Sequence, residues 1–113
     1  MYKEGNNMKR EETIKDKKLF NNIIRNGKFK KNEYYVLYNI RKEEPKINYG
    51  IAISKKVGNA VTRNKLKRQT RVIIDSHRNL FKNSNNYIIM IRKSCANIDY
   101  NILDKALVEL LEK

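Results

Sequence analysis

The longest regular pattern in the sequence is an amphipathic stretch from about Ala60 to Arg78. When successive residues are placed about 100° apart, as on a helix, apolar and cationic side chains fall on two separate arcs. Asn59 stands just before the stretch, where its side chain can cap a helix, and Gly58 permits a sharp entry. The apolar arc holds Leu66, Thr70, Ile73 and His77, and the cationic arc holds Arg63, Asn64, Lys67, Arg68, Arg71 and Arg78. The stretch therefore predicts a helix that packs on a core with one face and carries positive charge on the other.

Two further helices are predicted, one at each end of the chain. Thr13 is placed as the cap of the first helix, which Asn26 and Gly27 end. The apolar positions of the first helix are Leu19, Phe20, Ile23 and Ile24, and those of the last are Ile102, Leu103, Ala106, Leu107, Leu110 and Leu111. Residues 1–12 are polar and are expected to form a disordered tail, which leaves residues 13–113 as a single domain.

The strands are predicted from runs of β-branched and aromatic residues. Residues 34–40 and 49–54 are separated by a short turn, so a hairpin is the natural interpretation. The nearly all-apolar run at residues 87–93 is typical of a central strand, and a short extra strand is expected near Phe29. The predicted order is helix, strand, strand, helix, strand, helix.

Positive charge is concentrated in one part of the chain. The 113 residues include 26 Lys and Arg against 12 Asp and Glu, a net charge of +14. Between Glu44 and Asp75 there are eight cations and no acid, whereas residues 99–113 hold four acids and two lysines. A general bias in composition would not remove acids from one segment only. Clustered charge of this kind indicates a polyanion partner, most often nucleic acid, and favours it over a membrane surface.

Several classes of function are disfavoured by the sequence. No stretch approaches the roughly 18 apolar residues of a membrane helix, and the first residues do not resemble a secretion signal, so we expect a soluble cytoplasmic protein without a membrane partner. One Cys and one His cannot form a disulfide framework or a Cys and His metal cluster. His77 is expected to be a packed, hydrogen-bonded residue and Cys95 to be incidental. The acids are scattered, and we assign neither a catalytic residue nor a metal ligand to the chain.

The segment from Ser54 to Arg71 carries the strongest functional signal. Two lysines precede a helix whose first backbone N–H groups are free to bind an anion. Arg63, Lys67 and Arg71 then follow at intervals of about 6 Å along the axis, close to the repeat of a nucleotide backbone. A merely solvated face would more comfortably alternate signs, because like charges at this spacing repel by a few tenths of a kcal/mol. An anionic ligand is therefore favoured over simple solvation of the helix.

The strands suggest a second binding surface. Tyr34, Val36, Tyr38 and Ile40 share one face of the first long strand, and small residues at Gly50, Ala52 and Ser54 share one face of the next. An open floor of small residues beside Tyr38 could stack unpaired bases, at about 1–3 kcal/mol each. From the residues alone, a place in the core is favoured for Phe20 over a place in the wall of a groove.

The segment SKKVGNAVTRNKLKRQTR resembles the basic box of the bacterial ribonuclease P protein family, which reads approximately K-K-x-G-N-A-V-x-R-N-R-x-K-R-x-x-R. The matching positions are Lys55, Lys56, Gly58, Asn59, Ala60, Val61, Arg63, Asn64, Lys67, Arg68 and Arg71. The chain departs at Lys65, where the family usually has Arg, and at Ile24, where it often has an aromatic residue. The resemblance extends from Lys15 to the C-terminus.

This resemblance implies both a fold and a role. The fold is α+β: an α/β two-layer sandwich with one mixed sheet of about four strands and three helices, like the second domain of a small-subunit ribosomal protein. It has a left-handed crossover around the box helix, where right-handed connections are usual. The implied role is that of the protein component of ribonuclease P, which removes the 5′ leader from precursor tRNA. In this role the RNA subunit performs the hydrolysis with bound Mg²⁺, and the protein alone is inactive.

The resemblance also implies which residues meet which RNA. The catalytic RNA, in a 1:1 complex, is assigned to Lys55, Asn59, Arg63, Asn64, Lys67, Arg68 and Arg71. The single-stranded leader of precursor tRNA is assigned to Phe20, Tyr34, Val36, Tyr38, Ala52 and Lys56, which moves Phe20 from the core to the groove wall. The alternative function is a general RNA-binding or ribosome-associated chaperone protein without a role in cleavage. A nuclease acting alone is disfavoured by the absence of acid pairs.

Overall fold

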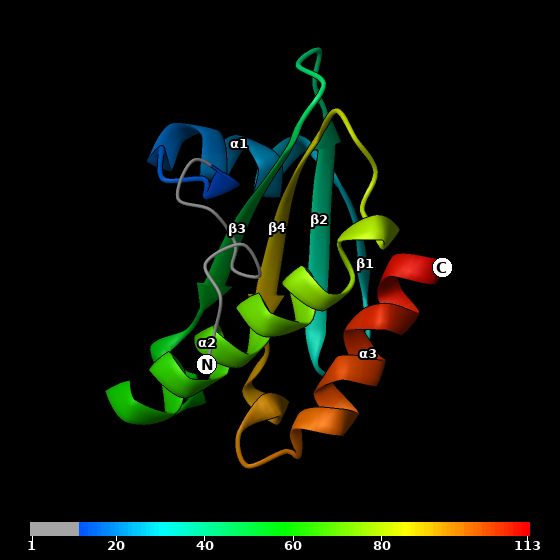
Figure 1. Cartoon of the computed structure of the whole chain (residues 1–113). Helices are drawn as coiled ribbons and strands as arrows, with labels where there is room; N and C mark the ends of the chain where they lie inside the picture. The colour runs from blue at the N-terminus through cyan, green and yellow to red at the C-terminus, as the bar shows by residue number, and fades with distance from the viewer. Residues whose placement is uncertain (1–11) are drawn as a thin grey trace.

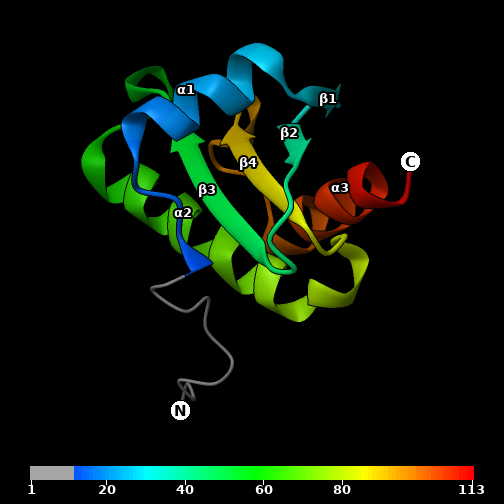
Figure 2. The same cartoon turned by 90° about the horizontal axis from the view of Figure 1, so that it is seen from above.

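The computed structural model describes residues 12–113, which form a four-stranded sheet with helices on both faces (Figures 1 and 2). The elements in chain order are α1 (Lys17–Asn26), β1 (Lys28–Lys31), β2 (Tyr35–Arg41), β3 (Ile47–Ile53), η3 (Lys55–Val57), α2 (Ala60–Ser76), η4 (Arg78–Leu80), β4 (Asn85–Ile91), η5 (Lys93–Cys95) and α3 (Tyr100–Glu112), where η marks a short 3₁₀ turn. The predicted order of elements is confirmed, including the short strand at Phe29. The α+β class with one mixed sheet and three helices is confirmed as well.

The predicted hairpin between β2 and β3 is wrong, because β4 lies between them. The strand order is β1-β2-β4-β3, in which β4 pairs antiparallel with β2 and parallel with β3. All but one of the seven β4 residues are buried. A strand that is apolar on both faces is most stable when it has a neighbour on each side, and this favours the central place for β4 over a direct pairing of β2 with β3.

The connection from β3 through α2 to β4 has the expected unusual hand. In Figure 1, both strands run downward, α2 lies in front of the sheet, and the chain passes from β3 on the left to β4 on the right. Figure 2, seen from above, agrees that α2 lies on the face opposite α1. The crossover is therefore left-handed, as the family resemblance implied. The start of α2 follows the end of β3 through the short turn η3.

The helices are divided between the two faces of the sheet. On one face α2 and α3 cover the main core, which contains Tyr35, Leu37, Tyr49, Ile73, Ile89, Ile91, Leu103, Leu107 and Leu110 among others. On the other face α1 covers a smaller cluster built on Ile14, Ile23 and Ile88. The expected two-layer sandwich thus consists of the sheet with α2 and α3, and α1 adds a partial cover to the opposite face (Figure 2). Part of that second face stays open.

The predicted cap is correct for α2, whereas the cap of α1 lies three residues later than predicted. The Asn59 side chain accepts a hydrogen bond from the Thr62 N–H at 2.9 Å, so the predicted cap of α2 is confirmed. The first helix is capped by Asp16, whose Oδ1 accepts from the Lys18 N–H at 2.9 Å. Thr13 instead forms a parallel bridge with Tyr49, because the chain still runs along the edge of the sheet there.

The ends of the other helices bring further corrections. Helix α2 ends at Ser76, and Arg78 leaves its cationic arc to pair with Glu12, the first described residue, at 2.5 Å. Residues 1–11 of the predicted tail lie outside the described residues. His77 is hydrogen-bonded as expected, with 2.7 Å between its Nε2 and Oδ1 of Asp104. Ile102, assigned to the apolar face of α3, is instead exposed, because the helix turns this position away from the sheet.

Cys95 is a core residue rather than an incidental one. Its side chain is fully buried, and the thiol donates to the backbone carbonyl of Tyr34 at 3.0 Å. Burial raises the pKa of the Cys95 thiol to about 11. The contact ties η5, which follows β4, to the segment that enters β2.

Candidate nucleic-acid interface

Helix α2 presents its positive charge on the side turned away from the core. Its buried residues are Leu66, Thr70, Ile73 and Ile74, as the predicted apolar arc requires. Arg68, Arg71 and Asn64 are exposed, and Arg63 and Lys67 are half-buried. In the part of the chain that the structure describes, no carboxylate pairs with any of these four cations. Uncompensated positive charge on one helix face suits a polyanion.

Two exposed lysines stand where β3 leads into α2. Ser54 caps the short turn η3 by accepting a hydrogen bond from the Lys56 N–H at 3.1 Å. Lys55 and Lys56 follow in that turn, and Asn59 then caps α2. The lysines therefore lie close to the positive end of the α2 dipole, which reinforces their attraction for phosphate.

The open part of the sheet forms a cleft on the same face as α1. Val36 and Ala52 both stand opposite Met90 in the register, so the three side chains share this face. The cleft has a volume of about 370 Å³ and is lined by Phe29, Lys31, Val36, Tyr38, Ser54, Met90, Ile91, Arg92 and Lys93. Its floor is apolar and aromatic and its rim is cationic. This combination suits a single-stranded nucleic acid, whose bases stack while its phosphates seek cations.

Most residues assigned to the leader come together around this cleft. Val36 and Tyr38 line it, Ala52 lies on the same face on the far side of Met90, and Lys56 follows Ser54 at one end. Phe20 projects from α1 onto the same face, where it packs half-buried against the smaller cluster. A Cβ at Gly50 would lie 3.0 Å from Cε2 of Phe20, so the glycine allows the ring to approach the sheet closely.

Tyr34 is the exception, because it does not share the face of Val36 and Tyr38. Strand β2 begins at Tyr35, and Tyr34 lies in the preceding turn, where its N–H donates to Oδ1 of Asn32 at 3.0 Å. Its side chain packs against the core on the other face and borders a separate hollow with residues of α3. Strand alternation does not extend to a residue in the turn, so the predicted common face of Tyr34 with Val36 and Tyr38 is wrong.

Six residues that line the cleft were not assigned from the sequence. They are Phe29, Lys31, Met90, Ile91, Arg92 and Lys93. They come from β1, from β4 and from the turn after β4, and only the pairing of β2 with both strands brings them beside Tyr38. The one available signal was the alternation in β1, which sets Phe29 and Lys31 on a common face.

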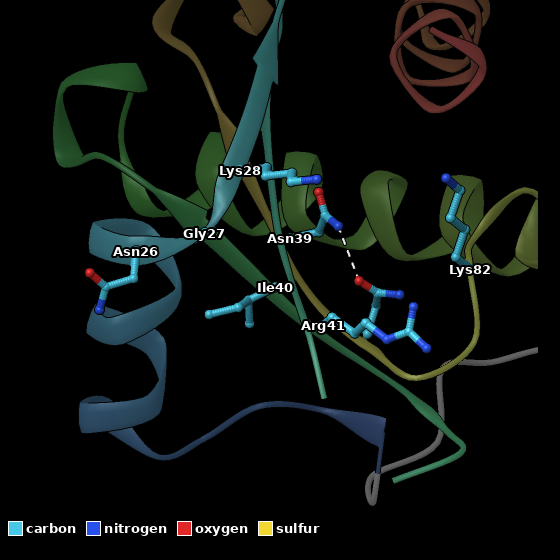
Figure 3. Close-up of a pocket in the computed structure, with 8 residues that line it drawn as sticks. Asn26, Gly27, Lys28, Asn39, Ile40, Arg41 and Lys82 are labelled. Carbon is cyan, nitrogen blue, oxygen red and sulfur yellow. Dashed lines mark hydrogen bonds between the residues drawn. The ribbon is translucent and has the colours of Figure 1, made fainter. Parts of the chain in front are cut away.

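A second hollow, of about 300 Å³, lies near the end of α1 (Figure 3). Lys28, Arg41 and Lys82 contribute to it from three different segments, and none of its lining residues is acidic. At its base Asn39 donates from Nδ2 to Oδ1 of Asn85 at 3.1 Å, as the dashed line in Figure 3 marks. This basic hollow was not predicted from the sequence.

The described residues offer no catalytic arrangement of their own. No carboxylate lines the cleft, and Asp75, the acid on α2, is paired with Arg78 at 3.2 Å. Among residues 12–113, no three or more His, Cys, Asp or Glu side chains are grouped so that they could hold a metal ion. None of the helices in this range has the length and apolar character needed to cross a membrane. What the two surfaces offer is cations, amides and apolar groups, which suit binding of a polyanion.

Comparison with known proteins decides between the two functions left open by the sequence. The family model described as Ribonuclease P matches residues 8–113. The chain belongs to the ribonuclease P protein family. Among curated relatives, the ribonuclease P protein component of Bacillus cereus (strain ATCC 10987 / NRS 248) is 35% identical over 107 residues, covering 94% of this chain and 93% of the relative. The corresponding protein of Bacillus anthracis (strain A0248) is also 35% identical, with coverage of 94% and 90%.

Solved structures of the ribonuclease P family share the fold. The protein from Staphylococcus aureus matches with a TM-score of 0.82 and 28% identity, covering 89% of this chain and 93% of that one. The protein from Thermotoga maritima matches with a TM-score of 0.76 and 28% identity, with coverage of 82% and 88%. The chain is accordingly a protein component of ribonuclease P, the accessory subunit of an endoribonuclease whose partner is the ribonuclease P RNA. A chaperone without a role in cleavage is no longer needed to explain it.

Two departures from the ribonuclease P family pattern can now be placed. Lys65 is exposed on α2, outside the cationic arc. Ile24 packs half-buried in the small cluster under α1 with Leu19 and Phe20. An aliphatic side chain there contributes apolar contact and no stacking surface.

Proposed function

We propose that the chain binds the catalytic RNA with the cationic face of α2 and holds the single-stranded 5′ leader of precursor tRNA in the cleft, in a 1:1 complex. The observation that carries this proposal is the join between the two surfaces. Ser54 lines the cleft and caps η3, and Asn59, five positions later in the chain, caps α2. An RNA leader that leaves the cleft at Ser54 therefore arrives at the start of α2, which carries the cationic face.

The catalytic RNA is assigned to α2 because of charge. The helix offers Arg63, Lys67, Arg68 and Arg71, and Lys55, Asn59 and Asn64 add polar groups at its start. Phosphate contacts of this kind position a protein on RNA without reading its sequence. We therefore expect tight, salt-dependent assembly.

The leader is assigned to the cleft because of its apolar floor. Val36, Tyr38 and Ala52 can contact bases, which are accessible only where the RNA is unpaired. Phe20 closes one side and Lys56 offers a cation where the leader meets the body of the tRNA. Mature tRNA lacks the leader and gains nothing from this surface, so the cleft distinguishes substrate from product.

The Mg²⁺ that the family resemblance implies is assigned to the RNA subunit. Mg²⁺ prefers carboxylate, phosphate and water oxygens, whereas the two protein surfaces supply cations, amides and apolar groups. The residues of the site therefore do not fit the ion, and no step of the proposal involves a metal on the protein. The protein contributes by raising the affinity for precursor tRNA at low Mg²⁺, while the RNA subunit performs the hydrolysis. We place the complex in the cytoplasm.

The proposal is tested by reconstitution. The protein is mixed with a bacterial ribonuclease P RNA and precursor tRNA at low Mg²⁺, and the 5′ end of the product is mapped, with protein-only and RNA-only reactions as controls. We expect cleavage at the mature 5′ end that needs both components. Cleavage by the protein alone would support a nuclease acting alone. Failure of the folded, RNA-binding protein to stimulate the reaction would reject the proposed role of the two surfaces.

A further inference from the structure

Phe29 is an exposed aromatic residue that the assigned functions leave unused. Its exposed fraction is 60%, whereas most other large apolar side chains of residues 12–113 are buried or half-buried. It lies on β1, the edge strand that pairs only with β2. A single exposed apolar residue is not unusual. What sets Phe29 apart is that its ring lines the cleft.

Phe29 and Tyr38 form an aromatic corner in that cleft. The two residues stand opposite each other in the register of β1 and β2. Their ring centroids are 6.0 Å apart and their planes meet at 40°. A base sandwiched between two rings needs about 7–8 Å, twice a carbon contact distance, so the corner is too tight for a sandwich. A base can instead lie with its face on one ring and its edge against the other.

Three cations line the same cleft as the aromatic corner. Lys31 shares the outward face of β1 with Phe29, and Arg92 and Lys93 line the same cleft from the end of β4. Lys30 points the other way and donates to the backbone carbonyl of Lys113 at 2.6 Å, which ties the edge strand to the end of α3. The strand that carries Phe29 is thereby held in place without using the ring.

We propose that Phe29 is a base-stacking residue of the leader site, which holds one unpaired base of the leader against Tyr38 while Lys31, Arg92 and Lys93 attract the adjoining phosphates. This inference rests on the proposed function and extends the leader site to the edge strand. Stacking at one leader position then gives that position a preference for certain bases. Larger bases bind there more tightly, because they have more stacking surface.

The experiment measures binding of leader-bearing precursor tRNA and of mature tRNA to the holoenzyme. The variants are Phe29→Ala, Phe29→Tyr and, as a matched control, Ile102→Ala, which removes an exposed apolar side chain from α3. We expect Phe29→Ala to weaken binding of precursor tRNA by roughly 5- to 150-fold and to leave mature tRNA unchanged. Phe29→Tyr should restore binding, and Ile102→Ala should have no effect on either RNA.

A scan of abasic leader substrates locates the base. At one position the abasic substitution should weaken binding to the unmodified holoenzyme and have no further effect on the Phe29→Ala holoenzyme. If Phe29→Ala binds like the unmodified protein while leader removal still weakens binding, the aromatic corner is rejected and the proposed function stands. If Phe29→Ala weakens both RNAs equally, the ring has a structural role and the inference is likewise rejected. If leader removal has no effect on the unmodified holoenzyme, the proposed function itself fails.

Discussion

The cationic face of α2 and the cleft adjoin each other but are constructed in different ways. The face is made by one helix, and its charges are set by spacing within 17 residues. The cleft is made by β1, β2, β4 and the turns at Ser54 and after β4, which meet only when the sheet is complete. The cationic face can therefore be tuned by single charges, whereas the cleft depends on how the strands and α1 are placed.

The two surfaces should also respond to different conditions. Phosphate contacts release counterions, so binding at α2 should weaken steeply with salt. Stacking on the apolar floor of the cleft involves no phosphate contact, so loss of a floor residue should weaken leader binding without changing its salt dependence. This division would be wrong if a variant of α2 changed the dependence on the leader, or if a variant of the cleft changed the dependence on salt.

The largest effect is expected from removing two charges of α2. Arg63→Ala combined with Arg68→Ala should reduce the slope of log affinity against log salt for the catalytic RNA by about 1.4–1.8, at about 0.7–0.9 for each lost phosphate contact. The slope is measured by titrating the protein into labelled catalytic RNA at several salt concentrations. An unchanged slope would mean that these side chains do not contact phosphate.

Tyr38→Ala is the matched variant for the cleft. It should leave that slope unchanged and weaken binding of leader-bearing substrate by about 1–3 kcal/mol, with mature tRNA barely affected. Equal losses for precursor tRNA and mature tRNA would assign Tyr38 to the core, and the cleft would no longer differ from α2 as a leader-specific surface.

A change at the junction of α1 and β1 should damage the cleft and spare α2. A Cβ at Gly27 would lie 2.5 Å from the carbonyl oxygen of Ile23 and 2.8 Å from that of Asn39, both backbone atoms. Gly27→Ala must therefore displace α1 or the strand, and we expect it to lower the free energy of unfolding by about 1–3 kcal/mol. Because Phe20 moves with α1, leader-dependent binding should fall as well.

Gly58→Ala is the control at the start of α2. A Cβ there would meet only the Thr62 side chain, at 3.1 Å from its methyl carbon, and the backbone is extended. The unfolding free energies of both variants are measured by urea denaturation. If Gly58→Ala costs as much stability as Gly27→Ala, the packing at Gly27 is not the cause.

These differences explain what the sequence could predict. The faces and the cap of α2 follow from helix periodicity and one Asn side chain, which are local properties, and they were predicted correctly. Tyr34 was assigned to the wrong face because strand β2 starts one residue later, at Tyr35, and the alternation of a strand does not extend to a residue in the preceding turn. The error affected the assembled surface and left the local one intact.

The rest of the cleft could not be predicted because it depends on pairing between distant strands. A short turn between two strands ordinarily favours a hairpin, and nothing within residues 34–54 reveals that β4 will insert between them. Phe29 and Lys93 reach the cleft only through the pairings of β2 with β1 and β4. The left-handed crossover came from the family resemblance, since general rules predict the opposite hand.

The smallest effect is expected from substitutions of Asn59, which distinguish the stability of α2 from its charge. Asn59→Ala removes the side chain that accepts from the Thr62 N–H, and should lower the free energy of unfolding by about 1 kcal/mol. Asp16→Ala removes the corresponding cap of α1 and should cost a similar amount. Asn59→Asp keeps an acceptor at the cap and adds a negative charge beside Lys55 and Lys56. It should therefore retain stability in urea denaturation and still weaken binding of the catalytic RNA, because the new carboxylate repels phosphate. If Asn59→Asp binds the RNA as tightly as the unmodified protein, the start of α2 lies away from the phosphates and the cationic face must bind through its later turns alone.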